Sequence, residues 1–309
     1  LLTDPIEFQL NSSTKSITKN VANVRPRTDI TATKAWVGGP DSKPSINLQL
    51  YQNGNPLGPS VELSNGYPTH TWSNLYVMDE SGTSFTYTVD EVTVPDNYIK
   101  STSADGLTVT NTYQSPKITV TGHKNWVGGP VAKPDIQLQL YRDGAAHLSP
   151  VTLSSGTTSY TWTGLDQTDA FGVNYTYTVD EVGKPANYGS SRSDDGLTVT
   201  NTYASPKTDI TGRKVWVNGE QNRPEFIELQ LYRQLAGGEK TAVGTAERLE
   251  KGTYEYVWKD MNMTDADGNP YTYTADEVNV PENYTKSIAD LTVTNTYEIP
   301  KTEITGKKI

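Results

Sequence analysis

The chain repeats itself three times, and this periodicity constrains its fold more than any other feature. A segment that reads TDITATKAWVGGP from residue 28 returns as ITVTGHKNWVGGP from residue 118 and as TDITGRKVWVNGE from residue 208. YTVDEV, which is YTADEV in the third unit, and a closing LTVTNTY recur with it each time. The first two units are offset by 90 residues, which is the length of one small β-sandwich domain. The sequence therefore predicts an array of similar small domains.

The domain boundaries are expected at the short proline-containing junctions that follow each LTVTNTY segment. The predicted repeats cover residues 28–115, 116–205 and 206–299. Residues 1–27 match the repeat poorly and are expected to end a preceding, divergent β-domain, whereas residues 300–309 resemble the start of a fourth repeat. Because short linkers that contain proline are semi-rigid, the repeats are expected to form an elongated, monomeric rod.

Strand signals fill each predicted repeat, and no segment has the pattern of a long amphipathic helix. Two segments have the pattern of β-hairpins, with Asn53-Gly54 and Asp143-Gly144 at their tips. No stretch approaches the roughly 18 apolar residues that a membrane-spanning helix requires. These features predict an all-β fold without membrane insertion.

The chain has no cysteine and a formal charge of −10. Small extracellular β-domains are often stabilised by disulfides, which cannot form here, so another device is expected to hold the domains together. The negative charge argues against nucleic acid and anionic membranes as partners.

One lysine, one glutamate and one asparagine interrupt the apolar strand faces of every repeat, because residues i and i+2 of a strand share a face. The lysine-to-asparagine spacing is 77, 77 and 81 residues, so the three residue types persist while loop lengths vary. Each residue type alone is usually exposed, but their joint recurrence indicates that they act together. The trios are Lys34, Glu91 and Asn111 in repeat 1, Lys124, Glu181 and Asn201 in repeat 2, and Lys214, Glu277 and Asn295 in repeat 3.

Burial would make such a trio reactive. It lowers the pKa of a lysine and raises that of a glutamate, so that both groups become neutral. A neutral amine can attack the asparagine carboxamide while the carboxylic acid transfers protons, which releases ammonia and leaves an isopeptide bond. The aspartate before each glutamate (Asp90, Asp180 and Asp276) is the alternative acid, but strand alternation places it on the opposite face.

The joint pattern T-x-x-K-x-W, Y-T-V-x-E-V and L-T-V-T-N-T-Y resembles Cna protein B-type domains of Gram-positive surface adhesins and pilins, across residues 28–299. The resemblance implies tandem, reversed immunoglobulin-like β-sandwiches, each with a Lys–Asn isopeptide bond promoted by an acidic residue. It assigns these roles to the three trios, with Glu91, Glu181 and Glu277 as the acids. It also implies that Lys308 belongs to a fourth unit and that Asn20 or Asn23 belongs to the preceding one.

These features together predict a stiff spacer that projects an adhesive domain from the cell wall of a Gram-positive bacterium. Cross-linking would occur once per repeat, without turnover catalysis, cofactor or metal. The alternative is that variable loops, such as residues 233–247, bind a host matrix protein or a glycan directly. The segment DADGN at residues 265–269 looks like part of a calcium loop, but Pro270 occupies the position of the EF-hand glycine.

Overall fold

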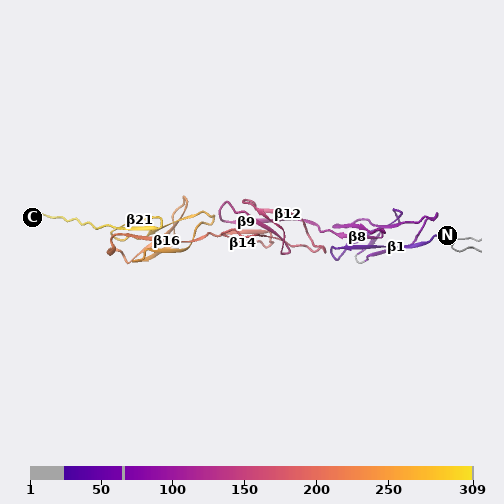
Figure 1. The fold of residues 1–309 in the computed structure, drawn as a ribbon, viewed down its shortest axis with the longest axis horizontal. Coiled ribbons are helices and arrows are strands. Elements are labelled where there is room, and N and C mark those ends of the chain that lie inside the picture. The colour runs from indigo at the N-terminus through magenta and orange to yellow at the C-terminus, as the bar shows by residue number, and fades with distance from the viewer. Residues whose placement is uncertain (1–23, 65–66, 308–309) are drawn as a thin grey trace, which may run out of the picture. The chain divides into compact units, whose positions relative to one another are not determined.

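The computed structural model describes residues 24–64 and 67–307 (Figure 1). Within these ranges the regular structure is all β, apart from the 3-10 turn Glu220–Asn222. The predicted all-β fold is therefore confirmed. Across the same ranges, no helix has the length and apolar character needed to cross a membrane. Asn20, Asn23 and Lys308 lie outside the described residues.

Repeat 1 is a sandwich of two sheets. The first sheet has the order β5-β1-β8-β7, and in the second β2 pairs with β6 and with the short strands β3 and β4. Its strands are β1 Arg27–Val37, β2 Ile46–Gln52, β3 Asn55–Pro56, β4 Val61–Leu63, β5 Thr69–Tyr76, β6 Tyr87–Glu91, β7 Tyr98–Thr102 and β8 Thr108–Tyr113.

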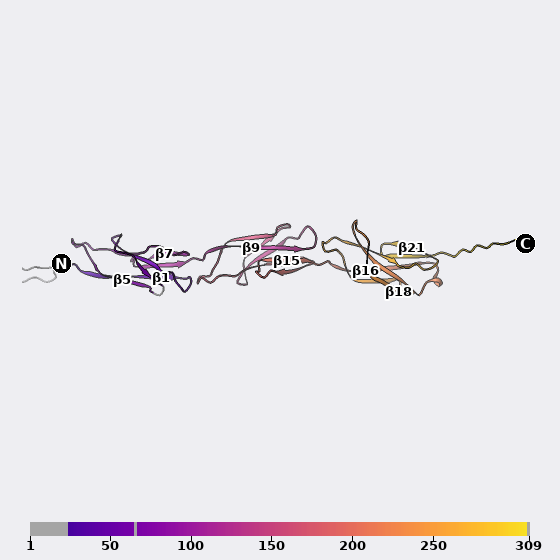
Figure 2. The same cartoon turned by 180° about the vertical axis from the view of Figure 1, so that it is seen from behind.

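Repeats 2 and 3 have the same topology as repeat 1. Figure 2 shows the strands of the three repeats from the side opposite to Figure 1. Their first sheets are β12-β9-β15-β14 and β19-β16-β22-β21, and their second sheets are β11-β10-β13 and β18-β17-β20. The strands of repeat 2 are β9 Lys117–Val127, β10 Ile136–Arg142, β11 Ala145–Leu153, β12 Ser159–Asp166, β13 Tyr177–Glu181, β14 Tyr188–Arg192 and β15 Thr198–Tyr203. Those of repeat 3 are β16 Lys207–Val217, β17 Phe226–Leu235, β18 Thr241–Glu250, β19 Glu255–Asn262, β20 Tyr271–Glu277, β21 Tyr284–Ala289 and β22 Thr292–Tyr297.

The two predicted hairpins form as expected. Gln52 pairs with Asn55 and Arg142 with Ala145, so each connection has two residues. Asn53 and Gly54 have φ values of 51° and 80°, which is the left-handed pair that a type I′ turn requires. In contrast, the segment 233–247 was expected to be a variable loop and is largely the two arms of the β17–β18 hairpin.

The first and last strands of each repeat are neighbours and run parallel. In repeat 1, Lys34 pairs with Val109 and Trp36 with Asn111 across the β1–β8 ladder. The same register recurs between β9 and β15 and between β16 and β22. This pairing brings residues that are far apart in the chain into one sheet, which strand alternation alone does not predict.

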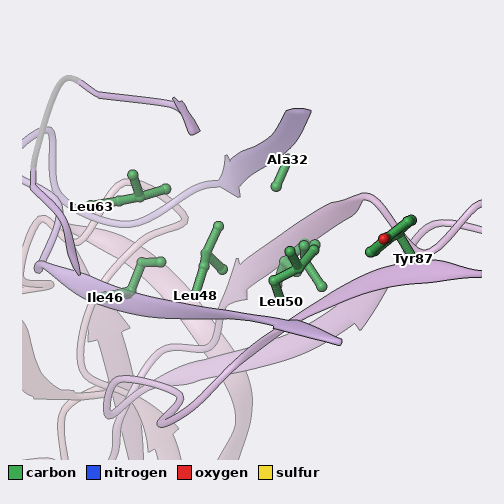
Figure 3. Packing of buried hydrophobic residues seen from close by; sticks show 8 residues of the cluster. Ala32, Ile46, Leu48, Leu50, Leu63 and Tyr87 are labelled. Carbon is green, nitrogen blue, oxygen red and sulfur yellow. The ribbon is translucent and has the colours of Figure 1, made fainter. Parts of the chain in front are cut away.

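Apolar residues from both sheets fill the space between them. In Figure 3, Ile46, Leu48 and Leu50 project from β2 toward Ala32 of the facing sheet. Leu48, Leu50 and Ala32 are fully buried. Because burial of a leucine side chain contributes about 1.5–3 kcal/mol, these contacts hold the two sheets together and fix which strand faces are dry.

By their contacts, the described residues form two compact units. One contains residues up to Val120 together with Trp162–Tyr175, and the other contains Thr121–Thr161 together with the residues from Thr176 onward. The division passes through repeat 2, and the predicted repeat boundaries remain predictions. Residues 301–307 form no strand, because a strand is stabilised by its ladder partners and this segment has none among the described residues.

Candidate functional site

The first strand of each repeat places its predicted reactive lysine inside the sandwich. Lys34 in β1, Lys124 in β9 and Lys214 in β16 are 4%, 3% and 2% exposed. Each Nζ also lies over the ring of the tryptophan two residues later, 4.0–4.3 Å from its centroid. Strand alternation causes this arrangement, because the lysine and the tryptophan share the inward face of their strand.

In repeat 1 the carboxyl group of Glu91 contacts both the lysine and the asparagine. Lys34 Nζ is 3.4 Å from Glu91 Oε2, and Asn111 Nδ2 donates a hydrogen bond of 3.0 Å to Glu91 Oε1. Glu91 comes from β6 in the second sheet, whereas Lys34 and Asn111 come from the neighbouring strands β1 and β8 of the first. The two sheets thus bring an amine, a carboxyl group and a carboxamide together, away from water.

Repeats 2 and 3 place the same groups together with small differences. Lys214 Nζ is 3.5 Å from Glu277 Oε2, and both side chains are fully buried. Lys124 Nζ is farther from its partner, at 3.9 Å from Glu181 Oε2. Asn201 and Asn295 have no exposed surface and occupy the same register position as Asn111, opposite the tryptophan of the first strand. Repeat 2 therefore has the longest lysine–glutamate distance of the three.

Burial favours the neutral forms of the three lysines and of two of the glutamates. Loss of hydration lowers the pKa of Lys34, and it lowers the pKa of Lys124 and Lys214 to about 8, although the charge of the nearby glutamate opposes the shift. Burial likewise raises the pKa of Glu181 and Glu277 above the usual range of a carboxyl group. Each site therefore holds an amine that can act as a nucleophile beside a carboxyl group, in one buried cluster with an asparagine carboxamide.

Many polar atoms of the trios are buried without a hydrogen-bond partner. An unsatisfied buried polar group costs about 1–3 kcal/mol. Oε2 of each glutamate is nevertheless within 3.4–3.9 Å of the lysine Nζ and so has a charged partner. The atoms without a hydrogen-bond partner are Glu91 Oε2, Asn111 Oδ1, both carboxyl oxygens of Glu181 and Glu277, and both side-chain amide atoms of Asn201 and Asn295.

The aspartate that precedes each glutamate faces away from the trio, as strand alternation predicts. The side chain of Asp90 is 45% exposed and pairs with a basic residue at the edge of the sandwich. An aspartate on this face cannot reach the asparagine carboxamide, so the glutamate is the acid in contact with the other two groups. The ion pairs are Asp90–Lys100 at 2.6 Å, Asp180–Arg192 at 3.7 Å and Asp276–Lys286 at 2.5 Å.

These basic residues are not evident as site residues from the sequence alone. Lys100 and Lys286 each follow the glutamate of their repeat by nine residues, whereas repeat 2 has Ser190 at that position and Arg192 two residues later. The nine-residue spacing is a weak signal, because only strand pairing shows that the lysine lies beside the asparagine.

The DADGN segment of repeat 3 forms a turn and uses its aspartate oxygen within that turn. Asp265 Oδ1 accepts hydrogen bonds from the backbone NH groups of Asp267 and Asn269. Asp79 and Asp169 accept equivalent bonds in repeats 1 and 2, whose loops lack the motif. In the part of the chain that the structure describes, no group of three or more His, Cys, Asp or Glu residues is arranged to hold a metal ion.

Comparison with known proteins gives matches over all three repeats. The sequence model of the Cna protein B-type domain matches residues 30–112, 120–202 and 210–296. The collagen adhesin of Staphylococcus aureus is 33% identical over 296 residues, which is 91% of this chain and 24% of that protein. The chain thus spans 24% of the length of this relative.

Two solved structures from the same organism are also similar. Two B repeat units of the collagen-binding protein of S. aureus share 27% identity with a TM-score of 0.42, covering 88% of this chain and 74% of that chain. A single B repeat unit of that protein shares 27% identity with a TM-score of 0.26, covering 58% of this chain and 99% of that chain. The three segments matched by the domain model contain every lysine, glutamate and asparagine of the trios.

Proposed function

Because the chain belongs to the family of Cna protein B-type domains, we propose that it is a structural spacer of a bacterial surface adhesin whose repeats cross-link themselves. The observation that carries this proposal is the burial of the side chains of one lysine, one glutamate and one asparagine between the two sheets of every repeat. Each trio forms a Lys–Asn isopeptide bond once, so the protein is not a turnover enzyme.

In the proposed reaction the neutral amine of the lysine attacks Cγ of the asparagine. The protonated glutamate donates a hydrogen bond to Oδ1 as negative charge develops there, and it relays the proton lost by the amine to Nδ2. The C–N bond of the carboxamide breaks, ammonia leaves, and an amide joins Nζ to Cγ. The glutamate ends in the protonation state in which it began.

The geometry of repeat 1 supports the role of the glutamate in proton relay. Glu91 is 3.4 Å from Lys34 Nζ and is hydrogen-bonded to Asn111, so one carboxyl group contacts both the nucleophile and the leaving group. The dry surroundings strengthen the electrostatic interactions of the carboxyl group with the reacting atoms. Because the sheets hold all three groups in place, little conformational freedom is lost on the way to the transition state.

The cross-link would connect the first and last strands of each repeat. These strands are parallel neighbours, so force applied to the two ends of a repeat would pass from one strand to the other through the bond. Each asparagine precedes the lysine of the next repeat by only 13 residues in the two complete junctions. We propose that this short path between bonds makes the array a spacer that resists extension.

We propose that the spacer lies outside the cell of a Gram-positive bacterium, in a surface protein that is anchored to the cell wall. The support is the 33% identity with the collagen adhesin of S. aureus. Contact with host matrix or a glycan is proposed for the whole protein, and the repeats serve as its support. An isopeptide bond also fits a chain without cysteine, since it stabilises an extracellular domain without a reducible disulfide.

The intact mass of the wild-type chain is expected to be lower than the sequence mass by three ammonia molecules, about 17 Da each, because each cross-link is a covalent change that unfolding does not reverse. Mass spectrometry under denaturing conditions measures this deficit. Glu91→Gln, Glu181→Gln and Glu277→Gln are each expected to restore one ammonia.

Glu282→Gln is the matched control, because Glu282 is an exposed glutamate of repeat 3. It should retain the full deficit. A wild-type mass equal to the sequence mass would contradict the proposed cross-links, and the ligand-binding alternative would then become the hypothesis to pursue.

The rate of cross-linking in repeat 3 is expected to be bell-shaped in pH. The reactive state has a neutral Lys214 and a protonated Glu277. It carries the same number of titratable protons as the ion pair, in which the proton is on Lys214 and not on Glu277. The rate should therefore be level at intermediate pH, fall below the raised pKa of Glu277, and fall above the Lys214 pKa of about 8. To measure this profile, the chain is isolated unfolded and unreacted, refolded at a set pH and sampled over time by mass spectrometry. A rate that keeps rising above pH 9 would contradict the need for a protonated glutamate.

A further inference from the structure

Lys100 connects the two sheets of repeat 1 beside the reactive trio. It lies in β7, directly opposite Asn111 in the β7–β8 ladder. Its Nζ crosses to β6 of the second sheet, where it donates hydrogen bonds to Asp90 Oδ1 at 2.6 Å and to the backbone carbonyl of Glu91 at 3.4 Å. One lysine thus links β7, the neighbour of the strand that supplies the asparagine, to the strand that supplies the glutamate.

Lys286 repeats this arrangement in repeat 3 with a shorter contact. It lies opposite Asn295 in the β21–β22 ladder. Its Nζ donates to Asp276 Oδ1 at 2.5 Å and to the backbone carbonyl of Glu277 at 2.9 Å. The side chain of Lys286 is only 23% exposed, so its ion pair is shielded from water in part.

Repeat 2 differs at this position and has a longer lysine–glutamate distance. The residue opposite Asn201 is Ser190, and Arg192, two residues along β14, reaches Asp180 at 3.7 Å. The lysine–glutamate distance in this repeat is 3.9 Å, compared with 3.4 Å and 3.5 Å in the other two. The wider pair therefore occurs in the repeat that lacks a lysine opposite the asparagine.

We propose that Lys100 and Lys286 are positioning residues for cross-linking, which hold the backbone of the glutamate so that its carboxyl group lies between the amine and the carboxamide. This inference rests on the isopeptide chemistry proposed above. A misplacement of the order of 1 Å in a reacting group can cost as much as a hundredfold in rate. Repeat 2 is therefore expected to cross-link more slowly than repeats 1 and 3.

The charge of Lys286 gives the role a signature that loss of packing would not produce. Lys286 pairs with Asp276 of β20, and its charge also acts on Lys214 of β16 and Glu277 of β20. Burial and the Lys214–Glu277 interaction contribute most to the pKa shifts of these two groups, and the positive charge of Lys286 adds a smaller downward contribution to the pKa of each. Removal of that charge raises both pKa values, so both limbs of the pH–rate profile of repeat 3 move to higher pH.

The test follows each cross-link separately in the full chain, which is isolated unfolded and unreacted, then refolded and digested at set times for mass spectrometry. Lys286→Ser installs the serine of repeat 2 in repeat 3, and Lys286→Arg keeps the positive charge. Ser190→Lys with Arg192→Thr gives repeat 2 the residues of repeat 1. Lys259→Ser, at an exposed lysine of repeat 3, is the matched control.

Lys286→Ser is expected to slow cross-linking of repeat 3 by about tenfold or more and to shift its pH profile upward, because the glutamate is held less firmly and a nearby charge is lost. Lys286→Arg should recover most of the rate. The double change in repeat 2 should speed its cross-linking toward that of repeat 1. Unchanged cross-linking rates in both altered repeats would overturn the positioning role of the lysines, although the proposed cross-links would still stand. Absence of ammonia loss in the wild-type chain would overturn the proposed function itself.

Discussion

Under a stretching force, wild-type repeat 3 is expected to withhold the 80 residues between Lys214 and Asn295 from extension, whereas a Lys214→Met chain releases them. At 3.3–3.6 Å per residue, the released segment adds about 260–290 Å of contour length. Methionine is chosen because it fills the lysine site with an apolar side chain and provides no amine.

The reason lies in the path of the force. It enters repeat 3 through β16 and leaves through β22, which are parallel neighbours. Without the cross-link, the ladder between Arg213–Val217 and Thr292–Thr296 carries the load through backbone hydrogen bonds alone. With it, the force passes from Lys214 to Asn295 through covalent bonds, and the sheets between them are never loaded.

Single-molecule force spectroscopy on the full chain distinguishes the two states by step length. Lys259→Met is the matched control, since Lys259 lies exposed on β19 of the same repeat. It should extend like the wild type. A wild-type chain that shows the full step from repeat 3 would contradict a covalent bond at this site, and an unextended Lys214→Met chain would show that something other than this bond resists the force.

The sequence predicted the all-β class and the composition of the site, because both follow from alternation along single strands. Lys34, Glu91 and Asn111 stand out as polar residues on apolar faces, and the structure places all three in contact. The choice of Glu91 over Asp90 as the inward-facing acid follows from the same alternation, and the exposed Asp90 bears out that face assignment. The chemical roles of these residues remain predictions.

Other features depend on which strands become neighbours, and a single sequence does not encode that locally. The parallel pairing of β1 with β8 decides that the lysine and the asparagine lie in one sheet. The same pairing rule places Lys100 opposite Asn111, so its contact with Glu91 is visible only in three dimensions. The prediction of a loop at residues 233–247 was wrong, because this segment forms the two arms of a long hairpin. Its Gly and Lys residues interrupt the apolar alternation by which a strand is recognised.

Loss of the cross-link in repeat 3 is expected to lower the melting temperature of that repeat by roughly 15–40 °C. The comparison uses Lys214→Met with Glu277→Gln, which removes the bond and both buried charges together. In the chain-entropy account of covalent cross-links, closing a loop of this length stabilises the folded state by about 4–5 kcal/mol. Each kcal/mol corresponds to about 4–8 °C for a domain of this size.

Differential scanning calorimetry of the full chain measures the change, and repeats 1 and 2 provide internal references in the same trace. Lys259→Met with Glu282→Gln is the matched control, because it makes the same changes at exposed positions of the repeat. Its transitions should shift by less than about 4–8 °C, since two surface substitutions usually change stability by less than about 0.5 kcal/mol each.

The single change Glu277→Gln separates the covalent effect from the electrostatic one. It prevents the reaction and also leaves Lys214 buried without its carboxylate partner, and breaking a buried ion pair costs roughly 3–5 kcal/mol. Glu277→Gln should therefore melt below the double variant, although it carries fewer substitutions. If the double variant melted with the wild type while its mass had regained one ammonia, the bond would form without stabilising the repeat. The cross-link would then act only under force, because loop closure would contribute nothing measurable to the folding equilibrium.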